Sequence, residues 1–279
     1  MRKAILERVS TRTFGKEVLS KKQIDEIKAV IDKYKGIKGP FGNSFEFTFN
    51  LNSNNEGKKQ KIGFYGMIKN VPAYIGGVSL DTRNSIIDFG YLFEKVILEL
   101  TTLGYDTCWL GGSFRRSTYR KKLAPNEVIP AICPVGHRAD QRSFLDKRIR
   151  SAAQSHKRLP FGTLFQYFDE EKELEETTDS RFIDIMHLIQ RGPSASNKQP
   201  WRFFVAEKHD VIYAYLERTE GYGIALGYDI QALDAGIALA HLEIGLENYD
   251  FKFDREEETK GVFFDGLEYI MTYKRAITE

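Results

Sequence analysis

The sequence has 279 residues, with 41 Lys and Arg against 39 Asp and Glu and a net charge of +2. This near balance argues against a dedicated nucleic-acid-binding protein, in which basic residues clearly exceed acidic ones. Only two cysteines occur, both in apolar surroundings, so neither a disulfide framework nor a metal site is expected. The amino terminus lacks the apolar core of a secretory signal, and four charged residues interrupt the longest apolar stretch, 86–103. We therefore expect a cytoplasmic protein that contacts no membrane.

Hydrophobic periodicity and turn residues predict the elements in chain order. A short helix is expected over 4–9. Ser20 with Gln23 three residues later forms a capping-box signature, which predicts that a second helix begins there. Aromatic and polar residues alternate over 45–51, the pattern of a half-buried strand. Further expected elements are strands over 61–67, 71–78, 106–110 and 129–135, a helical turn over 117–123, and a long apolar helix over 84–103.

Two charge runs follow these elements. Residues 142–158 are strongly basic and residues 169–179 strongly acidic. The basic run lacks the interleaved aromatic residues of a nucleic-acid stacking platform. A solvated acidic run is typical of a linker or an exposed helix face. We accordingly expect two units, a first over 1–165 and a second, shorter one over 166–279.

The pattern of the first unit returns in the second. GPFGNSFEFTF and GPSASNKQPWRFFV both begin with Gly-Pro, reach an Asn and run into an aromatic-rich alternating strand. Three pairs of segments match in the same order, namely 24–25 with 183–184, 39–49 with 192–205, and 88–90 with 234–236. This order indicates two fused copies of one unit, of which the second lacks the extreme amino-terminal segment.

Three short motifs carry groups suited to ligand binding. Arg8, Ser10 and Arg12 place two guanidinium groups around a hydroxyl, which suits a phosphate or a flavin ring edge, although an exposed helix end has the same pattern. The segment 193–201, PSASNKQPW, predicts a rigid loop rich in hydrogen-bonding groups that can grip a polar planar ligand. Gly111 and Gly112 end an apolar strand, where their backbone can approach a flat cofactor or simply turn.

Other motifs point to no specific chemistry. The segment 221–227, GYGIALG, resembles a dinucleotide-binding loop but has one residue too many before its last Gly and no clear preceding strand. An ordinary turn is the preferred interpretation. The five histidines show no metal-ligand spacing, and structural roles are expected for His187 and His241. No catalytic acid or base can be identified.

Taken together, these motifs resemble the FMN-dependent nitroreductase-like family, and in particular its internally duplicated single-chain branch, a pseudo-dimer. ILERVSTRTF is similar to its opening signature, PSASNKQPWRF to its flavin loop, and DFGYLFEKVILELTTLGYDTCWLGG to its central helix and Gly turn. The resemblance implies an α+β fold with a three-layer α-β-α arrangement. Two fused half-units, each with a mixed, mostly antiparallel sheet, would pack through their long helices.

The resemblance also implies a flavin site and a reaction. The residues expected to bind FMN are Arg8, Ser10, Arg12, Gly111, Gly112, His156, Arg158, Pro193, Ser194, Ala195 and Asn197. The implied protein is a monomer or weak homo-oligomer with one FMN per chain. It would pass hydride from NAD(P)H through FMN to a nitroaromatic, quinone or similar small acceptor. The alternative is a non-catalytic flavin-binding or ligand-sensing protein with a degenerate site.

Overall fold

The computed structural model describes residues 1–52, 68–114, 116, 123–140, 157–168, 174, 179–256 and 264–276. The expected strand over 61–67 lies outside these residues. The expected helical turn over 117–123 also lies outside them, apart from Leu123. Most of both charge runs also falls outside them.

The first half of the chain forms three helices and six short strands within the described residues. In order they are α1 (Arg2–Glu7), α2 (Lys21–Lys33), β1 (Thr48–Leu51), β2 (Ala73–Gly76), β3 (Ser79–Leu80), α3 (Arg83–Thr102), β4 (Asp106–Thr107), β5 (Glu127–Val128) and β6 (Ile132–Gly136). The expected strand over 106–110 is shorter than predicted, since Leu110 takes part only in an isolated bridge to Ile132.

The second half repeats this order of elements. It contains α5 (Phe161–Leu164), β7 (Phe165–Tyr167), α6 (Ser180–Gln190), η3 (Ala195–Asn197), β8 (Trp201–Val205), β9 (Val211–Glu217), η4 (Ile224–Leu226), α7 (Ile230–Asn248), β10 (Phe253–Glu256) and β11 (Leu267–Arg275). The first strand pair and long helix, β1-β2-α3, therefore correspond to β8-β9-α7.

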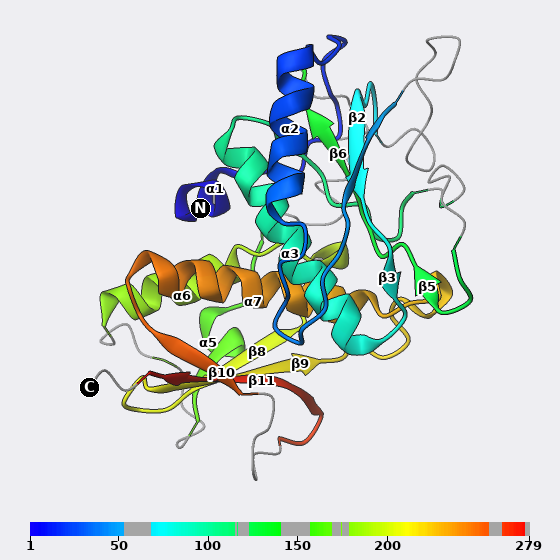
Figure 1. The fold of residues 1–279 in the computed structure, drawn as a ribbon. Helices are drawn as coiled ribbons and strands as arrows, with labels where there is room; N and C mark the ends of the chain where they lie inside the picture. Colours follow the sequence, from blue (N-terminus) through cyan, green and yellow to red (C-terminus); the bar gives the residue numbers. More distant parts are fainter. Residues whose placement is uncertain are drawn as a thin grey trace.

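The two larger sheets have the same strand neighbours. Figure 1 shows them as separate sheets, with β2 and β6 in the first and β8, β9, β10 and β11 in the second. The first has the order β1-β2-β6-β4, and the second contains β8-β9-β11-β10 with β7 added beside β8. All their pairings are antiparallel except that of β7 with β8, which is parallel. β3 and β5 form a separate two-stranded sheet. The described strands thus confirm the predicted α+β architecture of two fused halves.

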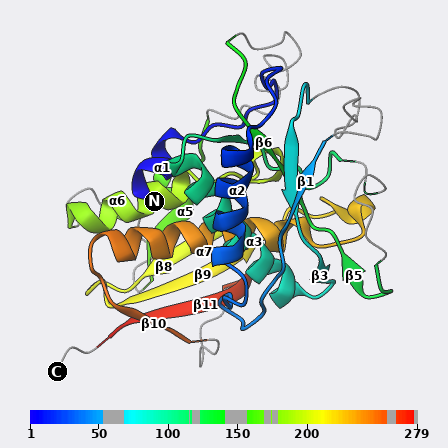
Figure 2. The same ribbon diagram turned by 45° about the horizontal axis from the view of Figure 1, so that its top comes forward.

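The long helices α3 and α7 cross in the centre of the molecule and join the halves. A Cβ atom added to Gly236 of α7 would lie 2.0 Å from the Ile87 carbonyl oxygen of α3, and one added to Gly90 would lie 2.2 Å from the Leu233 carbonyl oxygen. Because each helix presents a glycine at the crossing, their backbones can touch. Figure 2 shows α6 and α7 side by side above the second sheet.

The helices α2 and α6 occupy matching positions but are capped differently. Ser20 and Gln23 form the predicted capping box at α2. At α6 the side chain of Asp179 accepts a hydrogen bond from the Arg181 backbone N–H. The Arg181 side chain also bonds this exposed carboxylate and holds the pKa of Asp179 down at about 2. The same helix therefore begins with a neutral cap in one half and a charged cap in the other.

Across the described residues, no helix combines the length and apolar character needed to cross a membrane. No group of three or more His, Cys, Asp and Glu side chains arranged to hold a metal ion occurs among these residues either. Both cysteines are buried as free thiols.

Candidate functional site

A cavity of about 800 Å³ lies between the two halves. Its volume is within the range of small-molecule and cofactor sites, roughly 300–1,000 Å³. Of the eleven residues expected to bind a flavin, ten line this one cavity, namely Arg8, Ser10, Arg12, Gly111, Gly112, Arg158, Pro193, Ser194, Ala195 and Asn197. His156 lies outside the described residues. The fold thus brings segments that are far apart in sequence to the wall of one cavity.

One end of the cavity is cationic. Arg8, Arg158 and Arg191 all line it, and among its lining residues only Asp234 carries a carboxyl group. Burial lowers the pKa of Arg158, and the positive charges of Arg191 and Arg8 lower it further. The Arg8 Nη1 atom is buried and has no hydrogen-bond partner among the described residues. Arg8 and Arg158 are half-buried and Arg191 is exposed, and this cluster of like charges is suited to an anion.

The loop over 193–199 is held in an unusual backbone conformation. Ser196, Asn197 and Gln199 all have positive φ angles, between 48° and 57°. These conformations are uncommon for residues other than glycine and cluster at functional sites. The Ser194 hydroxyl accepts a hydrogen bond from the Gln199 backbone N–H at 2.9 Å, which braces the loop internally. The rigid polar loop expected from the sequence is present.

The side chain of Asp234, on α7, forms hydrogen bonds with the backbone of this loop. Both of its carboxylate oxygens lie 3.0 Å from the backbone nitrogen of Ala195, which donates to them. The side chain is buried and lines the cavity. Burial raises the pKa of Asp234 well above its ordinary value. The sequence marked Asp234 as part of the internal repeat, but it did not identify the residue as part of the site.

The Gly turn packs closely against the chain that enters α7. A Cβ atom at Gly111 would lie 3.0 Å from both Tyr228 Oη and Ile230 Cδ1, and one at Gly112 would lie 3.1 Å from Leu226 Cδ2. The Tyr228 hydroxyl is buried without a hydrogen-bond partner among the described residues. Because these two residues have no side chain, their backbone can pack directly against the chain that enters α7.

Residues 221–226 form another wall that the sequence did not predict as part of a site. Its glycines Gly221 and Gly223 have φ angles of 72° and 88°, and Gly227 follows with 72°. They allow a tight path that is unavailable to other residues. The segment consists of turns and the short helix η4, as the ordinary-turn interpretation expects, but a strand does precede it, because β9 ends at Glu217. The useful signal was the glycine spacing around apolar residues.

A buried polar chain fixes the side chain of Trp109, which also lines the cavity. Its indole Nε1–H donates to Glu94 Oε2 at 2.6 Å, and Glu94 Oε1 lies 2.9 Å from His241 Nε2. His241 Nδ1 lies 2.7 Å from the Leu188 carbonyl oxygen, so this nitrogen carries a proton. His241 thus has the structural role expected from the sequence.

Residues 1–246 match the profile of a protein family described as "Putative TM nitroreductase". The chain belongs to this nitroreductase family. The match confirms the family resemblance seen in the motifs. No protein with a curated description matches the sequence.

Two solved structures illustrate what the chain is similar to. One described as a "putative nitroreductase" from Thermotoga maritima is 20% identical, with a TM-score of 0.62 over 98% of this chain and 93% of that chain. An "FMN-dependent Nitroreductase" from Clostridium difficile is 18% identical, with a TM-score of 0.36 over 51% of this chain and 90% of that chain. The first of these supports the fold of the whole chain.

Proposed function

We propose that this nitroreductase-family protein is an FMN-dependent oxidoreductase. It would take hydride from NAD(P)H and reduce a nitroaromatic, quinone or similar small acceptor. The observation that carries the proposal is the cationic end of the cavity, where Arg8 Nη1 is buried without a partner among the described residues. A phosphate group would supply the missing acceptor and offset the repulsion between Arg8, Arg158 and Arg191.

The remaining cavity residues fit the rest of FMN. Ser10 and Arg12 would hold the ring edge, and the backbone at Gly111 and Gly112 would approach the flat ring system. The loop residues Pro193, Ser194, Ala195 and Asn197 would close the site from the second half, and His156 would assist the phosphate. FMN, when bound, supplies the hydride-transfer chemistry.

The protein's own contribution is binding, orientation and electrostatics. Guanidinium groups that are fixed in place before the reaction stabilise negative charge without reorganising. The braced loop over 193–199 and the Asp234 contact to Ala195 keep the opposite wall in position. Close packing of the Gly turn against Tyr228 and Leu226 fixes the position of the wall there.

We further propose that the chain is a pseudo-dimer with one such site. Units over 1–165 and 166–279 would play the parts of two protomers, and the assembly would be a monomer or a weak homo-oligomer. Arg8, Ser10 and Arg12 come from the first unit and the loop over 193–199 from the second. The first unit's equivalent loop, 40–44, has the sequence PFGNS and lacks the second unit's hydroxyl-rich pattern.

An absorption spectrum of the purified protein, followed by one of the supernatant after denaturation, tests this proposal. We expect a flavin spectrum and about one FMN released per chain. Anaerobic addition of NADH or NADPH should then bleach the flavin rapidly. Tight binding with slow bleaching would instead favour a flavin-binding sensor. Two equivalent flavins per chain would overturn the single site, and protein that neither contains nor takes up FMN would overturn the cofactor assignment.

A further inference from the structure

In the described residues, the two halves differ in how a strand leads into a long helix. In the first half, residues 77–82 join β2 to α3, and β3 within them pairs with β5. In the second half the corresponding connection, 218–229, is twice as long and contains η4. The additional length includes the cavity wall over 221–226, here called the glycine arm. The second half therefore places an extra segment beside the cavity.

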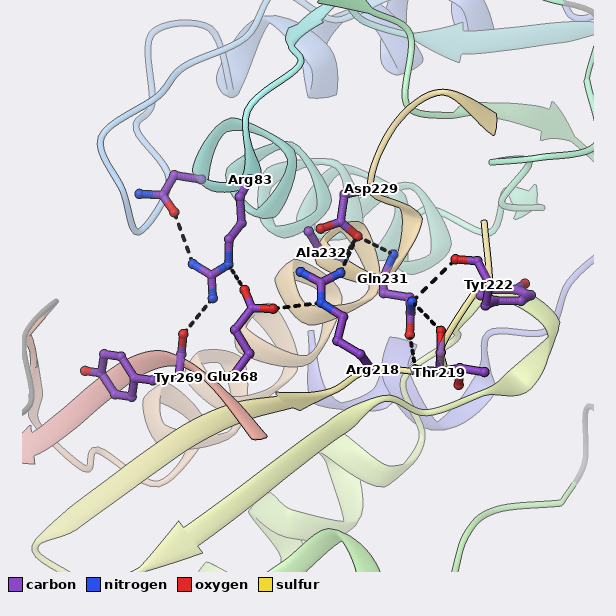
Figure 3. Close-up of polar contacts among 10 residues, drawn as sticks. Arg83, Arg218, Thr219, Tyr222, Asp229, Gln231, Ala232, Glu268 and Tyr269 are labelled. Atoms are coloured by element: carbon purple, nitrogen blue, oxygen red, sulfur yellow. Dashed lines mark hydrogen bonds and ion pairs between the residues drawn. The ribbon is translucent and has the colours of Figure 1, made fainter. Parts of the chain in front are cut away.

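The base of the glycine arm is clamped by a polar network (Figure 3). Gln231 Oε1 accepts a hydrogen bond from the Thr219 backbone N–H at 2.7 Å, and Gln231 Nε2 donates to the carbonyl oxygens of Thr219 and Tyr222. Arg218 bonds Asp229 across the base at 2.6 Å. A clamp of this kind gives the arm a defined position.

The same network reaches the first half of the chain. Arg218 Nε donates to Glu268 Oε2 at 2.7 Å, and Arg83 at the start of α3 also bonds Glu268. Burial by itself raises the pKa of Glu268, but the two arginines outweigh this and lower it. The base of the arm is thus tied to both halves (Figure 3).

The tip of the arm presents uncharged side chains to the cavity. Tyr222 is tied to the opposite loop, since its hydroxyl donates to Ser196 Oγ at 2.9 Å. Ile224 is 79% exposed at the cavity wall. The arm contains no charged residue, in contrast to the arginines of the cationic end. Leu226, the last residue of the arm, packs against the Gly turn.

We propose that the glycine arm is the docking platform for the second substrate, and that Ile224 at its tip selects an uncharged planar aromatic electron acceptor. This inference rests on the proposed function, which places the reactive ring beside the Gly turn. When a flat apolar molecule covers an exposed apolar side chain, the buried apolar surface favours binding. Because the backbone is already held in place, little conformational entropy is lost. A charged acceptor gains nothing from contact with the apolar Ile224 side chain and loses hydration there.

The test introduces a positive charge at the tip of the glycine arm. Ile224→Lys is compared with Val18→Lys, because Val18 is 81% exposed and lies outside the cavity wall. Oxidised protein loaded with FMN is titrated, without any reductant, with 2-methyl-1,4-naphthoquinone and with 1,2-naphthoquinone-4-sulfonate. Dissociation constants are read from fluorescence quenching. We expect I224K to weaken the uncharged quinone about tenfold and to tighten the sulfonated one, whereas V18K changes neither.

Retention of FMN after gel filtration is measured separately on each protein. Protein that retains FMN but shows the same quinone preference in I224K and wild type overturns this inference while leaving the proposed function intact. Equal weakening of both quinones also overturns it, since that result indicates general damage to the cavity. Wild-type protein that retains no FMN overturns the proposed function and, with it, this inference.

Discussion

Asp88 and Asp234 occupy matching positions on the two long helices, yet they support their loops differently. Asp88 accepts three hydrogen bonds, from the backbone N–H groups of Phe41 and Asn43 and from the Asn43 side-chain amide. Among the described residues, Asp234 accepts the N–H of Ala195 alone, shared between its two oxygens. Both carboxyl groups are buried. In the first half the Asp carboxylate therefore binds several donors of its loop. In the second half the corresponding carboxylate binds one donor and lies beside the cavity.

The two halves share the backbone arrangement that the repeated sequence pattern predicts, but the repeated Asp makes different hydrogen bonds in each half. Each half retains an Asp two residues before a Gly, because the Asp orders a loop and the Gly allows the helices to cross. What surrounds those residues has changed. Five experiments would break or sharpen this comparison.

The largest effect is expected from Gly236→Ala at the helix crossing. Its Cβ atom would meet the Ile87 carbonyl oxygen at 2.0 Å, and a backbone atom cannot move aside without shifting α3. We expect a loss of about 3 kcal/mol or more in the free energy of unfolding, measured by urea denaturation. Gly245→Ala on the same helix is the control, because its Cβ meets an Ile185 side chain at 2.9 Å. Equal losses for both variants would contradict the special role of the crossing.

Arg8→Met should separate ligand affinity from stability. Removing a guanidinium that faces Arg158 relieves repulsion, so the Tm of FMN-free protein should rise by about 2 °C. The Kd for FMN, measured by flavin fluorescence, should increase about 10- to 100-fold because a charged hydrogen-bond donor is lost. Lys28→Met, at an exposed position of α2, is the control. A lower Tm together with unchanged FMN affinity would argue against an anion site.

The matched variants Asp88→Asn and Asp234→Asn address the two loops directly. An amide at position 88 would set an NH₂ group against donors of Phe41 and Asn43, and we expect a cost of about 1–3 kcal/mol at neutral pH. At position 234 an amide oxygen satisfies the one N–H of Ala195, so a smaller loss is expected. Urea denaturation of both proteins would decide, and a reversed order would refute the comparison.

The pH dependence of Asp234→Asn has a defined sign. Burial raises the pKa of Asp234 in the folded protein above the unfolded value of about 3.9. The folded state then keeps a proton that the unfolded state releases, so this residue's contribution to stability falls as pH rises above about 4. The variant lacks that fall. Its free energy of unfolding relative to the wild type should therefore increase between pH 4 and pH 7.

The smallest effects concern the caps of α2 and α6. The pKa of Asp179 is about 2, below its ordinary value because Arg181 bonds the carboxylate. Its stabilising contribution is present above about pH 4 and is lost as pH falls toward 2. Asp179→Ser should remove that loss, which we expect to be below about 1 kcal/mol at this exposed site. Ser20→Ala should cost about 1 kcal/mol without acid dependence. Urea denaturation at pH 2.5 and pH 5 compares the two.

Much of the fold followed from local patterns in the sequence. The capping box at Ser20, the long apolar helix α3 and the internal repeat were all predicted, because each depends on short-range spacing of particular side chains. Strand ends were less accurate. The strand expected over 106–110 ends as a ladder at Thr107, since pairing beyond that point depends on β6 and not on local alternation.

The candidate site was predicted through its motifs and missed where no motif exists. Arg191 follows α6 as an ordinary helix-end cation, and only the folded chain brings it near Arg158. Tyr222 and Ile224 lie in a segment whose glycine spacing was compared with a dinucleotide loop. Their importance depends on the path of the backbone and on the Gln231 clamp, neither of which is visible in composition or periodicity.

The glycine contact between α3 and α7 has a consequence for how this scaffold can change. Asp234 lines the cavity two residues before the backbone of Gly236 meets that of α3. Separating the helices to enlarge the cavity would break the contact that unites the halves. New ligand preferences would therefore arise in the connections that surround the helices, among them the tip of the glycine arm. The helix crossing is constrained by its close backbone contact, whereas the connections around it are not.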